Sequence, residues 1–256
     1  MIAKYLKTAQ ISLRAQTNGG IWYLLPKILI RLVYLLPLML VWRVLLESGT
    51  QADMSLNQML SYTYLNALLT DLLVVRTQFS GWTYEGELVS LFNRPMPLFG
   101  QIIAQTVGEW IPMLFAFSLP MVLLSPLFGV SLHPATPWFY VSLLLCVSLG
   151  FAIDFVFACF TIRLKGMAWL VYMVRMSIIA LFSGSVIPFQ VMPFGLGKIF
   201  ALQPFGSLGG ASLSLFVGLA EPIPILLPQL VWNFILWPTA CFFFKKTQEK
   251  MVSYGG

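Results

Sequence analysis

The sequence predicts an all-α polytopic membrane protein that crosses the bilayer six times. Of its 256 residues, 59% are hydrophobic and only 9% are charged, which is far from the composition of soluble globular domains. The apolar residues gather in long stretches, each close to the roughly 20 residues that a helix needs to cross a bilayer core. We therefore expect six transmembrane helices, over residues 28–46, 56–75, 111–130, 138–162, 167–187 and 223–244.

The basic residues predict the orientation of these helices. Lys and Arg precede the first stretch and follow the second, fourth and sixth, whereas the gaps 47–55, 131–136 and 188–221 contain only Lys198. Because cytoplasmic loops carry the excess of Lys and Arg, both termini are expected on the cytoplasmic side of the cell inner (cytoplasmic) membrane. Anionic membrane lipids at the helix ends account for the net charge of +6, and no nucleic-acid partner is expected.

Residues 1–20 are expected to form a cytoplasmic amphipathic interfacial helix, and residues 21–256 a single six-helix transmembrane domain. At 100° per residue, the apolar side chains near the N-terminus fall within an arc of about 100°, and the basic ones point away from it. The apolar set is Ile2, Tyr5, Leu6, Ala9 and Leu13, and the basic set is Lys4, Lys7 and Arg14. A helix of this kind lies in the plane of the membrane surface.

Two connections between the predicted spans are long. The cytoplasmic connection 76–109 contains a short helix-like run, 85–92, and a break at Pro95 and Pro97. The outer connection 188–221 is rich in Gly and Pro but strongly apolar. Because so apolar a segment is unstable in water, we expect it to re-enter the outer leaflet or to cover the spans as short helices.

Three segments resemble a known family. GELVSLFNRPMPLFG (86–100) resembles the cytoplasmic segment after the second helix of ABC-2-type transporter permeases, the six-helix transmembrane subunits of bacterial ABC exporters. FSGSVIPFQVMPFGLGKIFALQPF (182–205) resembles their fifth helix and the outer segment after it, and the closing Tyr254, Gly255 and Gly256 resemble the ending of one bacterial subgroup.

This resemblance implies a transmembrane permease subunit of an ATP-driven exporter. Two permease chains, identical or paralogous, would rest on two copies of an ABC ATP-binding subunit, with the N-terminal helix beside the contact. The segment after the second span would be the helix that couples the two subunits; the alternative is an ordinary interfacial loop. The coupling residues that the resemblance implies are Glu85, Gly86, Glu87, Leu88, Leu91, Phe92, Arg94, Pro95 and Pro97.

The chain carries no nucleotide-binding motif of its own. The sequence contains no GxxxxGK[ST] pattern, and its glycine cluster at 207–212 has no Lys to reach a phosphate. We therefore expect no enzyme activity and no cofactor in this chain, with ATP and Mg bound by the partner subunit.

Two charged residues lie deep in the predicted spans. Asp154 and Arg175 are each about ten residues from the predicted turn near Leu164, hence about 15 Å deep at 1.5 Å per residue. Because a lone charge at mid-bilayer costs about 2.5–3.5 kcal/mol on insertion scales, we expect the two to form an intramembrane ion pair. The pair would staple two helices together, or it would serve ion coupling in a secondary transporter.

A polar stripe runs along the second predicted span. Its residues fall within about 100° of one another on a helical wheel, so they must face protein or water. With two serines of the fifth span, they line a substrate path or else supply hydrogen bonds between helices. The stripe is Tyr62, Thr63, Asn66 and Thr70, and the serines are Ser183 and Ser185.

No other constellation points to catalysis or metal binding. His133 is the only histidine and lies in a predicted outer loop, so neither a buried nucleophile–base pair nor a metal ligand set is expected. The three cysteines lie inside apolar stretches as small hydrophobic residues. The functions that remain beside the exporter subunit are an ion-coupled secondary transporter using Asp154 and Arg175 and a non-transporting membrane assembly factor.

Overall fold

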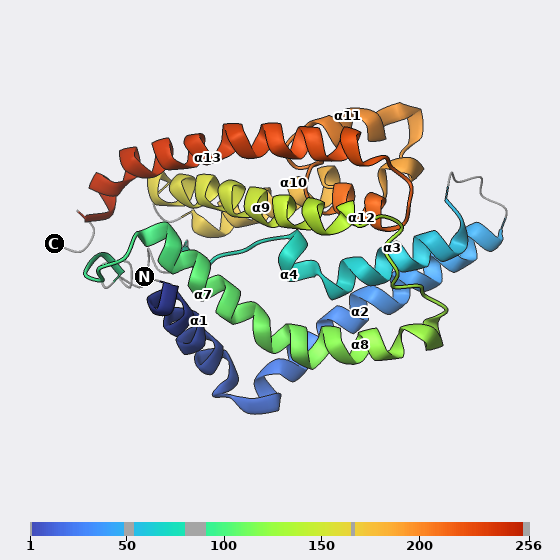
Figure 1. Cartoon of the computed structure of the whole chain (residues 1–256), viewed down its shortest axis with the longest axis horizontal. Helices are drawn as coiled ribbons and strands as arrows, with labels where there is room; N and C mark the ends of the chain where they lie inside the picture. The colour runs from blue at the N-terminus through green and yellow to red at the C-terminus, as the bar shows by residue number, and fades with distance from the viewer. Residues whose placement is uncertain (1, 49–53, 80–90, 165–166, 253–256) are drawn as a thin grey trace.

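The computed structural model describes residues 2–48, 54–79, 91–164 and 167–252, which are helical and contain no strand (Figure 1). Helices α8, α9 and α13 lie along the long axis of the molecule, whereas α1, α2 and α7 are inclined to it. The helices are α1 (Ile2–Thr17), α2 (Gly20–Glu47), α3 (Leu56–Leu68), α4 (Thr70–Leu73), α7 (Leu98–Met113), α8 (Leu119–Leu124), α9 (Trp138–Arg163), α10 (Ala168–Phe182), α11 (Leu196–Leu202), α12 (Gly209–Phe216) and α13 (Pro222–Val252).

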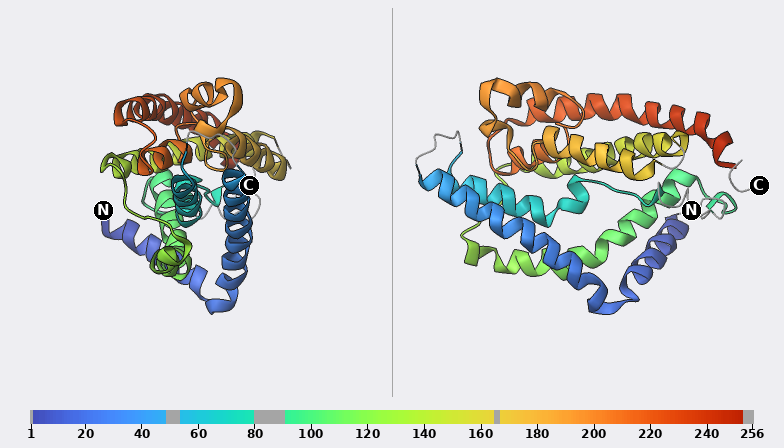
Figure 2. Two further views of the ribbon diagram at one scale, coloured as in Figure 1. Left: turned by 90° about the vertical axis from the view of Figure 1, so that its right-hand side faces the viewer. Right: turned by 180° about the vertical axis from the view of Figure 1, so that it is seen from behind.

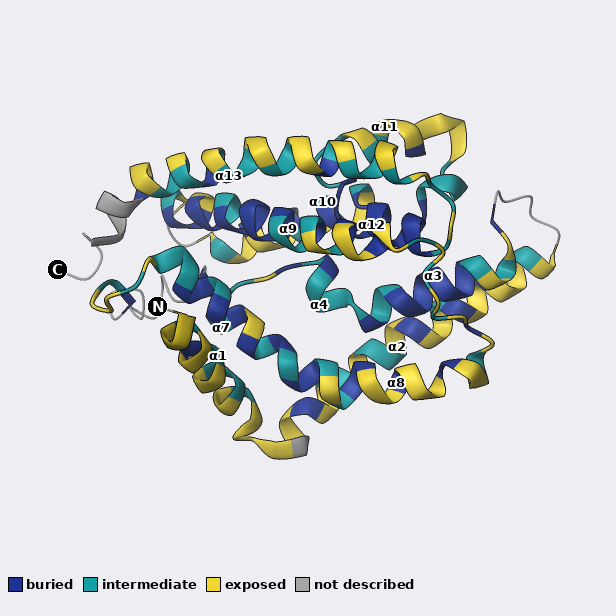
Figure 3. Ribbon diagram, in the orientation of Figure 1, coloured by how far each residue is buried: buried dark blue, intermediate teal, exposed yellow. Residues whose placement is uncertain are grey.

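Four helical segments in the described part of the chain are long and apolar enough to cross a membrane. They are Trp22–Glu47, Leu98–Phe128, Trp138–Arg163 and Pro222–Thr247. The second of these joins α7 to α8 through a π-helical turn (Leu114–Ser118) and ends in a 3₁₀ turn (Ser125–Phe128). Figure 3 shows exposed positions along these helices. Many of them are large apolar residues, such as Leu29, Leu144 and Phe234, as expected for helices that contact lipid.

The third predicted span begins earlier than the sequence pattern indicates. The expected start was residue 111, but the helix begins at Leu98, directly after Pro97. The cause is a row of polar residues, Gln101, Gln105 and Glu109, that recurs every four residues and therefore lies on one helix face. This face is buried or half-buried in the protein, so polar residues that resemble a loop in sequence belong to a helix.

The second and fifth predicted spans are shorter than expected. The second is divided between α3 and α4, because the backbone leaves the α-helical region at Leu69 (φ −102°, ψ 12°). It then becomes non-helical at Val74 (φ −126°, ψ 74°). The fifth, α10, has 15 residues. Within the described ranges, four of the six predicted spans correspond to helices long enough to cross a membrane, and the other two correspond to shorter helices.

The N-terminal helix packs against α7 (Figure 2). A Cβ added to Gly108 would lie 2.2 Å from the carbonyl oxygen of Ala9, so the two helices touch backbone to backbone. Thr8 is buried on the same side, whereas the side chains of Ile2 and Leu6 are 75% and 66% exposed. Helix α1 therefore uses one face to bind α7 and leaves apolar side chains beside it for lipid.

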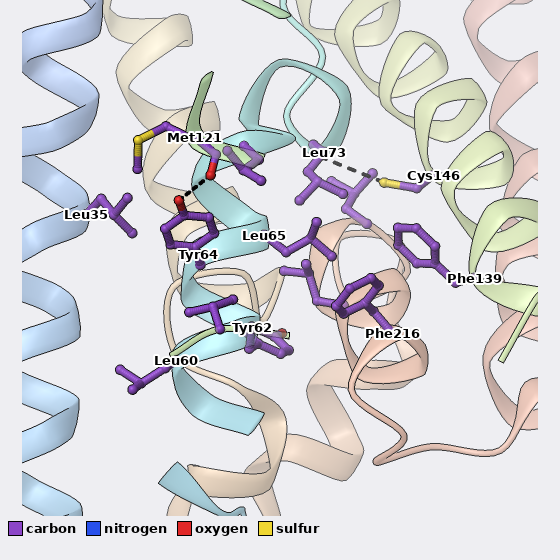
Figure 4. Close-up of a cluster of buried hydrophobic side chains, with 14 of the residues drawn as sticks. Leu35, Leu60, Tyr62, Tyr64, Leu65, Leu73, Met121, Phe139, Cys146 and Phe216 are labelled. Carbon is purple, nitrogen blue, oxygen red and sulfur yellow. Dashed lines mark hydrogen bonds between the residues drawn. The ribbon is translucent and has the colours of Figure 1, made fainter. Parts of the chain in front are cut away.

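The core lies where α3, α9 and α12 meet. Figure 4 shows Tyr62, Tyr64 and Leu65 of α3 directed toward neighbouring helices, with Phe139 and Phe216 close by. All eight residues of α12 are buried, although α12 is far too short to cross a bilayer. The segment 188–221 thus contains short helices, as expected, and one of them is inserted among the longer helices.

Candidate functional site

The break in the second apolar segment is the most unusual feature inside the helix bundle. After α4 the chain runs on without helical structure along α9 toward the start of α7 (Figure 1). Backbone groups released from a helix need new partners wherever water is scarce. Three carbonyl groups along this break receive such partners, each from a different helix.

The first two partners are small side chains. The hydroxyl of Ser118 donates to the carbonyl of Leu68 at 2.7 Å. The thiol of Cys146, a weak donor, lies 3.9 Å from the carbonyl of Leu73, which Figure 4 marks with a dashed line. Cys146 was expected to be only a small hydrophobic residue, so its role as a capping donor was missed by sequence reasoning.

The third partner is Arg175 of α10, which also forms the predicted ion pair. One guanidinium nitrogen, Nη1, donates to the carboxylate of Asp154, and the other, Nη2, donates to the carbonyl of Val75. Both charged side chains are only 6% exposed. The pair therefore forms within one chain, and it holds the unwound segment as well as two helices.

Asp154 binds the same segment from the other side. Its second carboxylate oxygen accepts the backbone N–H of Thr77 at 3.2 Å and also the Thr77 hydroxyl. Both oxygens of Asp154 are thus engaged by donors, as a buried carboxylate requires. Thr77 and Val75 were not predicted as site residues. In the sequence this segment resembles the end of a helix, and nothing there indicates that its backbone N–H and C=O groups lack helical partners.

A second ion pair joins α2 to α4. Arg31 Nη2 lies 2.5 Å from a carboxylate oxygen of Asp71, and the Arg31 guanidinium carbon is 5.3 Å from the centre of the Phe117 ring. Sequence reasoning missed this pair. The signal was present, because Arg31 and Asp71 each lie within about a turn of the cytoplasmic end of the expected spans 28–46 and 56–75.

The described part of the predicted coupling segment is anchored on α7. Gln101 donates to the carbonyls of Leu91 and Met96, at 3.0 and 2.8 Å. Leu91 is buried, Phe92 is half-buried, and the remaining described members are exposed: Arg94, Pro95 and Pro97. The other members, Glu85, Gly86, Glu87 and Leu88, lie outside the described residues.

Aromatic rings connect this anchored segment to the break. Leu91 and Phe79 belong to one buried cluster with Phe155 of α9. The Phe155 ring lies 6.2 Å from the Phe79 ring and 4.5 Å from the Phe99 ring, centre to centre. Because Phe79 is two residues after Thr77, the cluster and the Asp154 network hold the same short piece of chain.

The polar stripe has mixed surroundings. Tyr62 donates to the carbonyl of Gly184 at 2.6 Å, and the hydroxyls of Ser183 and Ser185 are 2.7 Å apart beside it. The Ser183 carbonyl also accepts the N–H of Gly210 of α12 at 2.8 Å. These contacts favour the alternative in which the stripe supplies hydrogen bonds between helices.

The other stripe residues do not join this cluster. The Thr70 hydroxyl donates to the carbonyl of Asn66 in its own segment at 2.7 Å. Thr63 is buried and Asn66 is half-buried in α3. A role of the stripe in a substrate path stays a prediction.

Helix α13 carries a polar ladder that sequence reasoning missed. Gln229, Asn233 and Trp237 recur every four residues and therefore face the same way. Gln229 donates to the carbonyls of Ser142 and Ser207, at 3.3 and 2.9 Å. Asn233 and Trp237 donate to the Leu145 carbonyl and the Ser148 hydroxyl of α9, at 3.1 and 2.9 Å. The signal was present in the sequence, because two amide side chains and a tryptophan recur every four residues within an apolar stretch.

Within the described ranges, no group of three or more His, Cys, Asp or Glu side chains could hold a metal ion. Comparison with protein-family models finds no family that matches this chain, and comparison with curated proteins finds no match either.

Proposed function

We propose that this chain is the transmembrane permease subunit of an ATP-driven ABC exporter. Two such chains, identical or paralogous, would form the substrate path as a dimer, each with an ATP-binding subunit on the cytoplasmic side. ATP and Mg would be bound by that partner, since this sequence has no motif for them. The family resemblance of segments 86–100 and 182–205 motivates this proposal, and the connections described above support it.

The proposal includes a location in the inner (cytoplasmic) membrane and six membrane crossings. Both termini then lie on the cytoplasmic side. Together α3 and α4 extend from Leu56 to Leu73, about 27 Å at 1.5 Å per residue. This is close to the roughly 30 Å of the hydrocarbon core. Helix α10, with 15 residues, provides about 22 Å. The charge distribution supports the orientation.

The observation that carries the proposal is a continuous set of contacts from the exposed loop to α10. Gln101 and the aromatic cluster hold the loop at Leu91, the same cluster holds Phe79, and Thr77 binds the Asp154–Arg175 pair. A force on the loop is therefore transmitted to α10 through packed side chains and charged hydrogen bonds.

The division between α3 and α4 provides a hinge for a movement driven by force on the loop. An intact helix resists bending, whereas a helix that is already divided at Leu69 can pivot there while its carbonyls stay capped. The Tyr62–Gly184 hydrogen bond links α3 to the end of α10. Closure of two ATP-binding subunits would thus change the packing of the second and fifth crossings across the dimer.

The Asp154 environment favours a packing role over ion coupling. Its carboxylate already accepts three donors, from Arg175 and from the backbone and side chain of Thr77. Taking up a proton would break charged hydrogen bonds in a buried site, which is costly. We therefore propose that the pair is structural during transport.

Purification from the native host in mild detergent tests the proposal. An ATP-binding cassette subunit should copurify with the wild-type chain, and it should be lost from Arg94→Glu, which reverses an exposed charge in the predicted contact. Lys198→Glu is the matched control, because Lys198 is also exposed but lies in α11, in the predicted outer segment. A chain that purifies alone and transports in liposomes without ATP, driven by a proton gradient, would refute the proposal.

A further inference from the structure

A small pocket opens between α9, α10 and the unwound segment. Its volume is about 70 Å³, and on the same measure a single water molecule needs about 10–15 Å³. Sites for drug-sized ligands measure about 300–1,000 Å³, so the pocket is too small for a transported molecule of that size. It has room for one small polyatomic group. The lining residues are Arg76, Thr77, Asp154, Phe157, Thr161, Val171, Tyr172 and Arg175.

The pocket has a net positive charge. Arg76 and Arg175 contribute two positive charges and Asp154 one negative charge, which leaves +1 among the lining residues. Asp154 is already paired with Arg175. Within the described part of the chain, Arg76 has no acidic partner, and its guanidinium donates to the Tyr172 hydroxyl at 2.8 Å.

The polar groups that remain free in the pocket are donors. Both oxygens of Asp154 are engaged, and the hydroxyls of Thr77 and Thr161 donate to Asp154 and to the Phe157 carbonyl. The Tyr172 oxygen accepts from Arg76, so its own hydrogen is free to donate. Within the described residues, the Nε–H of Arg175 has no hydrogen-bond partner, and this nitrogen is itself fully buried.

Unpaired donors with net positive charge favour a tetrahedral oxyanion. An oxyanion accepts several N–H and O–H groups at once, and guanidinium groups bind phosphate especially well. Tyr172 lies in the second turn of α10 and Thr161 in the last turn of α9. The mouth of the pocket therefore lies near the end of both helices that the charge distribution assigns to the cytoplasm.

The surroundings of the mouth are apolar. Trp169 and Met173 of α10 are 69% and 55% exposed beside Tyr172. An acyl chain can lie against such side chains, while a free ion gains nothing from them. Basic pockets between membrane helices on the cytoplasmic side are known to bind anionic head groups.

We infer that this pocket binds the phosphate of an anionic phospholipid from the cytoplasmic leaflet. Arg76 and Tyr172 hold the phosphate at the mouth, and the paired Asp154 and Arg175 line the same pocket. The lipid would then brace the Asp154–Arg175 network against the unwound segment. This inference rests on the proposed membrane orientation and is independent of ATP coupling.

The test uses the full chain alone, in dodecyl maltoside micelles. Its thermal unfolding midpoint is followed during titration with dioctanoyl phosphatidylglycerol, with dioctanoyl phosphatidylcholine and with inorganic phosphate. Phosphatidylglycerol should raise the midpoint saturably, because a ligand that binds the folded state stabilises it. Arg76→Gln should weaken the apparent affinity about tenfold, and Tyr172→Phe about threefold to tenfold.

The control variant is Arg14→Gln. Arg14 is an exposed arginine on the face of α1 away from α7, so its removal changes the net charge equally and should leave the titration unchanged. If Arg14→Gln and Arg76→Gln weaken the apparent affinity for phosphatidylglycerol equally, the stabilisation comes from general charge attraction, and the inference is overturned. Protection by inorganic phosphate as strong as that by phosphatidylglycerol would overturn the lipid as the source of the phosphate. An unchanged midpoint with phosphatidylglycerol would overturn the site itself. None of these outcomes depends on an ATP-binding partner, so failure here leaves the proposed function to its own test.

Discussion

Single side chains decide whether the break in the second apolar segment is stable. We predict that Asp154→Asn and Arg175→Gln each lower the free energy of unfolding by about 3–5 kcal/mol, because each leaves a buried charge without its counter-charge. The double variant should lose clearly less than the sum of the two. The measurement is a double-mutant cycle by denaturant unfolding in mixed micelles, and losses that add within about 0.5 kcal/mol would show that the pair is not coupled.

Ser118 offers a second test at this scale. Ser118→Ala removes the side-chain donor to the Leu68 carbonyl. The N–H of Leu72, the regular helical donor to this carbonyl, bonds the Leu69 carbonyl instead, so the loss should cost about 1–3 kcal/mol. Ser125→Ala is the matched control. The Ser125 hydroxyl donates to the Val122 carbonyl, but the backbone N–H of Ser125 donates to the same carbonyl and remains after the substitution. The same unfolding measurement should find a smaller loss for the control, and equal losses would contradict the capping role.

The packing of α1 on α7 is a property of whole elements. Gly108→Ala places a Cβ 2.2 Å from backbone of α1, which cannot yield without moving the helix. Gly100→Ala places one 2.7 Å from the Tyr5 ring, the end of a side chain that can turn aside. Both substitutions replace Gly by Ala within α7, which raises helix propensity by up to about 1 kcal/mol. We predict that Gly108→Ala destabilises by about 1–3 kcal/mol and that Gly100→Ala does not.

Limited proteolysis of α1 in micelles, together with unfolding, is the measurement for this pair of variants. Cleavage within α1 should rise in Gly108→Ala and stay low in Gly100→Ala. If both variants resist the protease equally, α1 does not depend on close contact with α7.

Long apolar elements were predictable from the sequence, because hydrophobic length needs no knowledge of neighbours. The helices near 28–46, 138–162 and 223–244 are found close to the expected places. The start at Leu98 was missed, because buried polar residues on one helix face resemble a loop when read in order. The division of α3 from α4 was also missed, since its cause is tertiary: Ser118, Cys146 and Arg175 supply donors from distant parts of the chain.

The same reasoning explains which part of the site could be predicted. Asp154 and Arg175 were paired from depth and charge alone, because a charge within a membrane span strongly requires a partner. Arg31 and Asp71 obey the same rule, but they lie near the ends of the spans 28–46 and 56–75 that the sequence predicts, where a lone charge is less costly. Thr77 gave no signal, because its contribution is partly a backbone N–H that only the fold releases.

The whole molecule makes a prediction about topology. In a background with the native cysteines replaced by serine, single cysteines at His133 and Lys198 should react in intact cells with a membrane-impermeant maleimide. Cysteines at Arg94 and Lys246 should react only after permeabilisation. All four positions are exposed, so access to the reagent depends on the side of the membrane. Labelling of position 94 in intact cells would mean that α3 and α4 do not cross, and the six-crossing proposal would fail.

The complete burial of α12 has a consequence for how the chain is made. An eight-residue helix is far below the length that a translocation channel can recognise as a membrane segment. Its position exists only once α3 and α9 stand side by side, and both precede it in the chain. Because synthesis starts at the N-terminus, α3 and α9 can pack together and form the site for α12 before α12 leaves the ribosome. Helix α13 then closes over it, so α12 enters late, as a folding step rather than an insertion step.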